Sequence, residues 1–207
     1  MHEIAHGCAA LYFGDTTARD MKRLSLNPLR HVDLVGTVLF PLILVLTKAP
    51  FVFGWAKPVP VDFSRLRRPK KDMVWVALAG PAMNLFQALC AFAVFSFFEN
   101  VLHSAPSEGA QEFLLNLIVI NLSVMTFNLI PVLPMDGGRI VTGLLPLPWA
   151  IRFAGTERHG FTVIAFLLIL LPVLGDYIGR DFDFISRFLA FAVQKVMLFF
   201  VGVFGLM

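Results

Sequence analysis

The chain has 207 residues, of which 57% are hydrophobic and only 15% are charged, and its mean hydropathy is +0.77. Soluble domains carry about 25% charged residues, so this composition excludes an ordinary soluble protein and predicts one polytopic membrane domain over residues 1–207. The net charge of +3 lies in basic loops and does not form the basic surface that nucleic-acid binding needs.

The first predicted element is a short helix over residues 1–13, which Gly14 ends. About 13 residues at 1.5 Å each give roughly 20 Å, which is less than the roughly 30 Å of a bilayer core. A charged amine at Met1 would be costly at that depth. We therefore expect that residues preceding Met1 are missing or that the start is wrongly assigned.

Basic and apolar stretches alternate in the next part of the chain. Residues 15–33 and 54–72 are rich in Lys and Arg, and short loops of this kind stay in the cytoplasm. The apolar stretch 36–53 between them is interrupted by Pro41 and Pro50. We therefore expect it to enter the membrane and return on the same side, as a re-entrant segment covered by protein.

Four later apolar stretches are long enough to span the membrane: residues 73–98, 113–133, 161–178 and 184–206. The loop 99–112 has no Lys or Arg and is expected outside, whereas the basic region 136–160 is expected in the cytoplasm. The loop before the last span has mixed charge and is expected outside, so the last span should run back inward. With the first helix, this gives an all-α fold of about five membrane helices.

A His-Glu-x-x-His motif occupies residues 2–6. On a helix, positions i and i+4 share a face, so His2 and His6 can converge on one metal ion. Catalytic zinc sites use three protein ligands and keep a fourth position for water. Zinc lowers the pKa of that water to about 7, and Glu3 is placed to accept its proton. The alternative is a chance match, which two histidines and a glutamate in a short apolar segment disfavour.

A third ligand is needed, and Asp136 is the best candidate. It follows the inner end of the span 113–133, at the depth where the first helix also ends. Pro131 and Pro134 break the helix, and Gly137-Gly138 permit a sharp turn that directs the carboxylate toward the metal. The alternative is that Asp136 caps a helix that begins at the glycines. The two histidines at matching depth favour the ligand.

Other polar residues leave two interpretations open. Asn128, in an apolar span, either holds helices together or donates a hydrogen bond to the oxyanion that forms when a peptide is attacked. Asn84 faces the same choice, and helix packing is favoured for it, with Gly80 allowing close approach of a neighbouring helix. His31 and Asp33 are either further ligands or, as we favour, loop residues.

The stretch 54–61 looks extended, and its two prolines block one edge because they have no N–H group. The other edge keeps its donors, at Lys57, Val59 and Val61. We expect a short β-hairpin here whose free edge binds an unwound substrate as an added strand. An ordinary proline-rich loop is an equal alternative.

Five segments resemble, in the same order, motifs of the site-2 protease family of intramembrane zinc metalloproteases: residues 2–7, 27–33, 54–61, 79–84 and 128–138. The resemblance implies that His2, His6 and Asp136 bind zinc, one ion per chain, that Glu3 activates water and that Asn128 assists. It also implies that the substrates are transmembrane segments of other proteins, cleaved in regulated intramembrane proteolysis.

The resemblance is to the compact bacterial or archaeal branch. Many members carry a PDZ domain in the connection that corresponds to residues 99–112, and this connection is too short to hold one. We therefore expect the chain to lie in a bacterial or archaeal cell membrane, with its site in the cytoplasmic leaflet.

A non-catalytic alternative stays open, in which the same residues hold structural zinc or bind a partner transmembrane helix. Structural zinc sites are closed by four protein ligands, and only three strong candidates are found, so the protease is favoured. A metal transporter would need ionisable residues spread over several spans, and the last two spans have almost none in their interiors.

Overall fold

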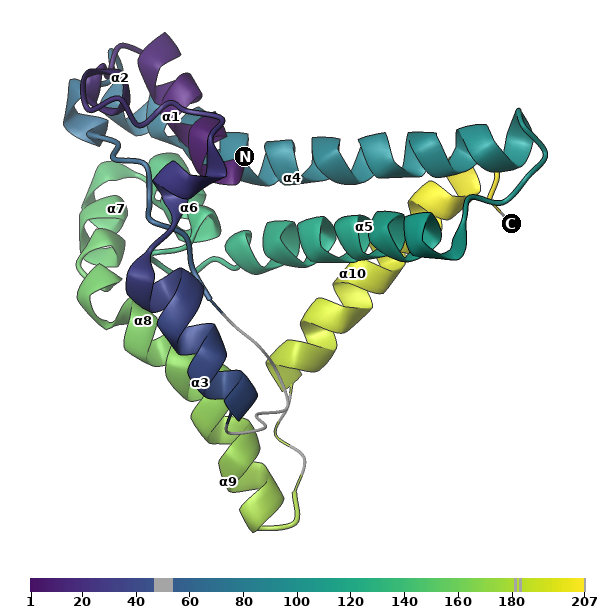
Figure 1. Ribbon diagram of the computed structural model, residues 1–207. Helices are drawn as coiled ribbons and strands as arrows, with labels where there is room; N and C mark the ends of the chain where they lie inside the picture. Colours follow the sequence, from purple (N-terminus) through teal and green to yellow (C-terminus); the bar gives the residue numbers. More distant parts are fainter. Residues whose placement is uncertain (47–53, 181, 183, 207) are drawn as a thin grey trace.

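The computed structural model describes residues 1–46, 54–180, 182 and 184–206, and Figure 1 shows the arrangement of its helices. All regular structure within these residues is helical. The elements in chain order are α1 (His2–Tyr12), α2 (Thr17–Asp20), η1 (Pro28–His31), η2 (Leu34–Leu39), α3 (Phe40–Leu46), η3 (Phe63–Arg65), α4 (Pro69–Asn100), α5 (Glu108–Asn128), α6 (Asp136–Leu144), α7 (Leu147–Ala154), α8 (Glu157–Ala165), η4 (Phe166–Leu170), α9 (Leu171–Tyr177) and α10 (Phe184–Val203).

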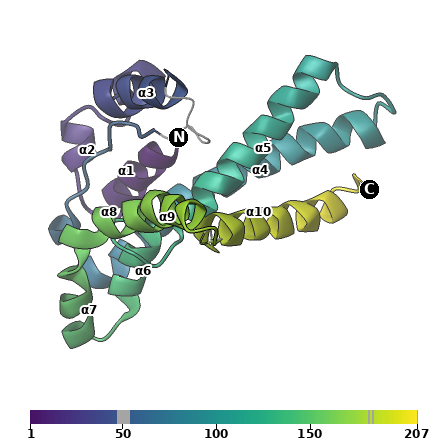
Figure 2. The ribbon, with the colours of Figure 1, turned by 90° about the horizontal axis from the view of Figure 1, so that it is seen from below.

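Three helices are long and apolar enough to cross a membrane: α4, α5 and α10. α4 and α5 lie side by side and antiparallel in both views (Figures 1 and 2). Their shared core contains the fully buried side chains of Phe92, Ile118 and Leu122, and α10 packs against the same cluster. The rings of Phe200 and Phe204 lie 5.9 and 5.7 Å from the ring of Phe92. Aromatic packing therefore joins α10 to the pair.

The N-terminal half of α4 carries the short helices that build the site. α1 lies along it (Figure 1), and Ala10, Leu66 and Val76 form a buried cluster at this contact. α6 packs on the same half of α4, where a side chain on Gly143 would collide with Val74. The small residues Ala10 and Gly143 thus let both short helices approach α4 closely.

Two apolar segments contain π-helical turns directly before a proline. η2 precedes α3, which has Pro41 as its second residue, and η4 precedes α9, which has Pro172 as its second residue. Proline removes one helical hydrogen bond and crowds the preceding turn, and in both places that turn is widened. The predicted span 161–178 is accordingly one continuous helical run, residues 157–177, made of α8, η4 and α9.

Three helices in the described part of the chain meet the length and composition of a span, and the number of about five membrane helices stays a prediction. α1 has 11 residues, or about 16 Å, and cannot cross a bilayer by itself. The run 157–177 is continuous, but its π-helical turn separates it into two α-helices that are each shorter than a span. The number of membrane helices therefore depends on whether helices that contain a π-helical turn are counted. Hydropathy alone does not distinguish such helices from regular α-helices.

The expected β-hairpin at residues 54–61 is wrong, since no strand occurs among the described residues. Trp55 N–H donates to the Gly36 carbonyl at 3.0 Å, and Lys57 N–H donates to the His31 carbonyl at 2.8 Å. These donors are two residues apart and the acceptors five residues apart. The two bonds are therefore out of register, and no regular ladder can form.

The predicted re-entrant segment 36–53 is described as far as residue 46. Gly54 lies directly against the carbonyl of Gly36 and the ring of Pro41. The chain is therefore back beside its starting point at Gly54. Residues 47–53, and Pro50 with them, lie outside the described residues.

The direction of α10 differs from the prediction. The Ser96 hydroxyl and the Asn100 amide both donate to the Phe204 carbonyl, at 2.9 and 3.0 Å, so α10 ends beside the loop between α4 and α5 (Figure 1). It runs in the same direction as α4, whereas the sequence predicted an end on the opposite side. The loop before α10 holds Arg180 among several aspartates. With so little excess of Lys and Arg, the positive-inside rule does not predict on which side of the membrane this loop lies.

We expect cysteines at residues 103 and 205 to be labelled from one side of the membrane and a cysteine at residue 19 from the other. The variants are His103→Cys, Gly205→Cys and Arg19→Cys, each made after Cys8 and Cys90 are replaced. A membrane-impermeant maleimide applied to sealed vesicles of known orientation gives the measurement. Labelling of Gly205→Cys together with Arg19→Cys would contradict the direction of α10.

Candidate metal centre

Three ligating side chains from α1 and α6 converge at one point. The Nε2 atoms of His2 and His6 lie 3.0 Å apart. One carboxylate oxygen of Asp136, Oδ2, lies 3.2 Å from Nε2 of His2. The other, Oδ1, lies 3.3 Å from Nε2 of His6. Zinc bonds of about 2.0–2.1 Å in a tetrahedron place neighbouring ligand atoms about 3.3 Å apart. Within the described ranges, this is the one group of three metal-ligating side chains that converges in this way.

The donor set fits zinc. Two imidazoles and one carboxylate form a recurrent ligand set of catalytic zinc sites. Asp136 is 9% exposed, and its Oδ2 is buried without a hydrogen-bond partner in the part of the chain that the structure describes. A buried carboxylate oxygen without a hydrogen bond is costly. A cation between the three side chains removes that cost.

The start of α6 explains where Asp136 lies. α6 begins at Asp136, its N-cap is Met135, and no side chain caps it. A side chain on Gly137 would collide with the carbonyls of Leu129 and Ile130. The glycines therefore lie within the first helical turn, where they let the incoming chain cross directly over α6. The Asp136 carboxylate faces the histidines and does not cap the helix, which was the alternative interpretation.

Each histidine is oriented by a partner on α4. The carbonyl of Val76 lies 2.7 Å from Nδ1 of His6, so this nitrogen carries the proton and Nε2 is left free for a metal. The amide nitrogen Nδ2 of Asn84 lies 3.1 Å from Nδ1 of His2. Rotation of this amide by 180° exchanges its nitrogen and oxygen, and the oxygen then accepts from Nδ1–H and orients His2 in the same way.

Asn84 lies at the candidate metal centre, a place that the sequence did not favour for it. We interpreted it as a packing residue, and it is 3% exposed and contacts His2, a candidate metal ligand. The available signal was its spacing, since Gly80 and Asn84 are four residues apart and share one face of α4. Added side-chain atoms on Gly80 would collide with both imidazole rings. The Gly80–Asn84 face of α4 is thus the surface on which both histidines lie.

Glu3 lies beside the three candidate ligands and is held by the extended segment 54–62. Its Oε2 accepts a hydrogen bond from the Val59 N–H at 3.0 Å. Glu3 and the three ligands all line one cavity of about 240 Å³. The remaining lining residues are Pro58, Val59, Val61, Phe63, Val76, Ala77, Asn128, Pro134 and Arg139.

Asn128 lies at this cavity, as expected for a residue that assists the reaction. Its amide donates one hydrogen bond, of 2.9 Å, to the Val124 carbonyl within the same helix. A primary amide has two N–H groups, so one is left to donate to a ligand. The structure thus allows the oxyanion role, which stays a prediction.

The predicted substrate-binding edge is already partly used within the chain. Lys57 N–H donates to the His31 carbonyl, and Val59 N–H donates to Glu3. Val61 lines the cavity, and no hydrogen bond of its N–H is found among the described residues. The edge is therefore not free at all three positions, and Val61 is the donor that an incoming strand can reach without breaking an existing bond.

His31 and Asp33 do not join the metal centre. His31 Nε2 lies 2.8 Å from the Ser25 carbonyl, and the Asp33 carboxylate accepts hydrogen bonds from Val35 N–H and Gly36 N–H at the start of η2. Both residues shape the loop, as the favoured interpretation held.

Arg139 is a cavity residue that the sequence did not single out. It is the one Lys or Arg among the residues that line the cavity. Its guanidinium pairs with Glu157 at 2.8 Å and lies 4.8 Å from the centre of the Phe63 ring. The available signal was its position three residues after Asp136, on the same face of a helix.

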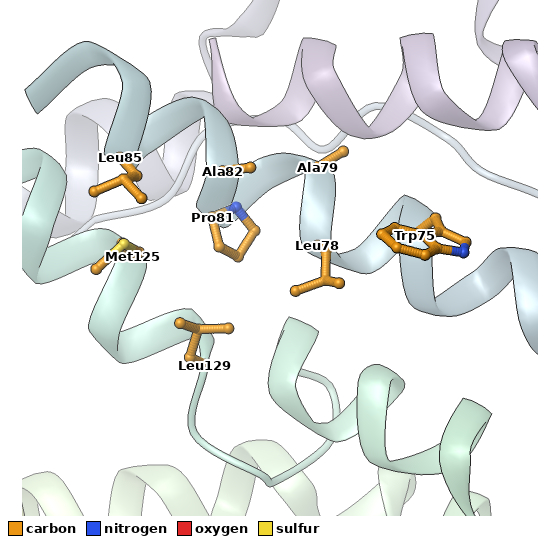
Figure 3. A pocket seen from close by; sticks show the side chains of 8 residues that line it. All are labelled: Trp75, Leu78, Ala79, Pro81, Ala82, Leu85, Met125 and Leu129. Atoms are coloured by element: carbon orange, nitrogen blue, oxygen red, sulfur yellow. The ribbon is translucent and has the colours of Figure 1, made fainter. Parts of the chain in front are cut away.

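A second hollow, of about 420 Å³, lies between α4 and α5 and has almost no polar surface (Figure 3). It contains none of the metal-ligating residues and offers no group for acid–base chemistry. Its lining residues are Trp75, Leu78, Ala79, Pro81, Ala82, Leu85, Met125 and Leu129.

The sequence of the chain is similar to those of known proteins. The profile of peptidase family M50 matches residues 100–171. The chain is 38% identical to YwhC of Bacillus subtilis (strain 168), a candidate zinc metalloprotease by its name, over 191 residues that cover 87% of this chain and 83% of that protein. The chain belongs to peptidase family M50. This confirms the resemblance to the site-2 protease family and makes the chain a member of a family of zinc metalloproteases.

Two further relatives match with lower identity or over a shorter stretch. Rip2 of Mycolicibacterium smegmatis, also named as a candidate zinc metalloprotease, is 25% identical over 198 residues, which cover 93% of this chain and 73% of that protein. Zinc metalloprotease MJ0392 of Methanocaldococcus jannaschii is 34% identical over 77 residues, which cover 37% of this chain and 21% of that protein. No solved structure matches the chain significantly.

We expect Gly80→Ala to weaken zinc binding by at least about tenfold, because the new methyl group would collide with both imidazoles. Zinc retained per chain after dialysis against a graded chelator gives the measurement. Gly109→Ala is the matched control, since a side chain there meets nothing within 4 Å. Equal zinc retention by the two variants would contradict the proposed packing of the histidines on Gly80.

We expect Asn84→Leu to weaken zinc binding by about 10- to 100-fold, because His2 loses the group that orients its ring. Asn84→Asp, which keeps an acceptor for Nδ1–H, should retain more zinc. The same chelator titration gives the measurement. Unchanged zinc affinity in Asn84→Leu would show that Asn84 serves only packing.

Proposed function

We propose that the chain is an intramembrane zinc metalloendopeptidase that hydrolyses peptide bonds in transmembrane segments of membrane proteins. In this proposal His2, His6 and Asp136 hold one zinc ion per chain. The observation that carries it is the convergence of these three side chains beside Glu3 at a single cavity. Membership of peptidase family M50 supports both the metal and the reaction.

The depth of the site supports a reaction inside the bilayer. Gly80, on which both histidines lie, is nine residues beyond Lys71 in the sequence, or about 14 Å along α4. Half of a bilayer core is about 15 Å. The basic run 65–71 at the start of α4 belongs on the cytoplasmic side. We therefore place the site in the cytoplasmic leaflet, and the bacterial and archaeal relatives support a prokaryotic cell membrane.

The residues divide the chemistry among them. Zinc, when bound, supplies a Lewis acid that makes water acidic enough to be deprotonated near pH 7. Glu3 accepts the proton of the attacking water and passes it to the leaving amine. The second N–H of the Asn128 amide donates to the oxygen on which negative charge develops. The Val59 N–H engages one oxygen of Glu3, which leaves the other oxygen for the proton transfer.

The proposed substrate is an extended stretch of an unwound transmembrane segment. The backbone of Val61 offers its first anchor by strand addition. Further pairing at Lys57 requires that its hydrogen bond to the His31 carbonyl opens, whereas the Val59 N–H stays on Glu3. Strand addition would thus begin at the cavity and proceed away from it.

A non-catalytic protein with structural zinc is the alternative function. A structural site needs four protein ligands. In the described part of the chain three side chains converge, and the nearby Glu3 is engaged by Val59. The arrangement thus favours an open site and a reaction.

We expect Glu3→Gln to retain zinc and to cleave a model transmembrane substrate about 10²- to 10⁴-fold more slowly, because only the proton acceptor is lost. Asp136→Ala should lose both zinc and cleavage. Zinc content and the rate of substrate cleavage in proteoliposomes give the two measurements. Glu108→Gln, at the exposed start of α5, is the matched control, and equal cleavage by Glu3→Gln and wild type would sink the proposal.

A further inference from the structure

The extended segment that holds Glu3 has no helix or strand to fix its position. Residues 54–62 lack regular structure, yet the Val59 N–H lies 3.0 Å from Oε2 of Glu3. Pro58 and Pro60 on either side of Val59 have no N–H group of their own. At Pro58 and Pro60 the backbone can therefore form hydrogen bonds with the rest of the protein only through its carbonyl groups.

Arg23 contacts the carbonyls directly before Val59. Its Nη2 donates to the carbonyls of Lys57 and Pro58, at 3.0 and 3.3 Å. Its Nη1 donates to the Arg30 carbonyl at 2.5 Å. One planar guanidinium thus joins the loop after α2 to the two residues directly before Val59. A lysine ammonium is a point charge and cannot reproduce this fork geometry.

The other end of the segment has a separate attachment. The Asp15 carboxylate is fully buried, and its Oδ2 accepts a hydrogen bond from the Asp62 N–H at 2.8 Å. Beneath the segment, a side chain on Gly7 would lie 2.8 Å from Val59 Cγ1, so the segment packs directly on α1. Upstream of Val59 the segment is held by Arg23 and by backbone hydrogen bonds of Trp55 and Lys57. Arg23 is the side chain that contacts the two residues directly before Val59, and Asp15 is the attachment downstream.

We infer that Arg23 is a positioning residue for the reaction. It holds Lys57 and Pro58 so that the Val59 N–H stays on Glu3 and directs the carboxylate into the cavity. Without Arg23, two carbonyls lose a charged donor, the segment shifts, and the Glu3 carboxylate turns away from its productive orientation. This inference rests on the proposed role of Glu3 as the proton acceptor.

The test compares Arg23→Gln with Arg30→Gln, which removes an equal charge from the same loop. Among the described residues, the hydrogen bond found for the Arg30 side chain is to the Lys22 carbonyl and not to the segment. We expect Arg23→Gln to lower kcat by about 10- to 100-fold, with KM and zinc content close to wild type, and Arg23→Lys to restore part of the rate. Arg30→Gln should behave as wild type.

A second measurement does not depend on cleavage. Amide hydrogen exchange in a peptide that covers residues 57–61 should become faster in Arg23→Gln and stay unchanged in Arg30→Gln, because only the first variant frees the segment. Unchanged exchange in Arg23→Gln would overturn the inference. Loss of zinc in parallel with activity would also overturn it, since that result indicates a general structural role.

A third variant removes the Val59–Glu3 hydrogen bond and also weakens the Pro58 carbonyl as an acceptor for Arg23, while the Lys57 carbonyl stays unchanged. Replacement of the Val59 amide by an ester removes the N–H with little change of shape. If Arg23 acts through this bond, the ester and Arg23→Gln together should slow the reaction no more than either change alone. Additive losses would overturn the inference. Failure of the proposed function is distinct, because wild type would then show no cleavage that depends on Glu3.

Discussion

The close approach of α1 to α4 at Gly80 is the constraint on which the site depends. Any larger residue at this position would occupy the space of both imidazole rings. The approach also brings each ring to its orienting partner on α4, the Val76 carbonyl for one histidine and the Asn84 amide for the other. The long apolar helix α4 thus provides the rigid surface on which the short helix α1 packs. Rigid elements hold a metal-ligand geometry better than loops do.

The proposed proton acceptor, Glu3, depends on a different kind of support. Glu3 is on α1, but its carboxylate is held by a segment without regular secondary structure. This segment is attached at both ends by charged side chains, Arg23 and the buried Asp15. A substrate strand must approach the same segment in our proposal. The groups that orient the base and the groups that receive the substrate are therefore neighbours, which links substrate binding to the position of Glu3.

The remaining long helices supply an apolar body around this polar site. α5 and α10 share a buried core with α4, whereas many large apolar side chains elsewhere are exposed, for example Phe188 at 62% and Phe199 at 64%. Such exposure is unfavourable in water and is expected of helix faces that contact lipid chains. The integral membrane character of the chain therefore follows from exposed surface as well as from hydropathy.

The sequence by itself determined the family, the membrane character and the set of residues that the structure brings to one cavity. These signals are local, because the i, i+4 spacing of two histidines acts within a single helical turn and an apolar run within a single helix. Asn84 and His2 are 82 residues apart, and Val59 and Glu3 are 56 residues apart. Only the packing of helices against one another decides such contacts, and it also decided the irregular backbone at residues 54–61 and the direction of α10. The spacing of residues along the chain does not indicate which distant groups come into contact. These contacts, the backbone at residues 54–61 and the direction of α10 could therefore be known only from the tertiary structure.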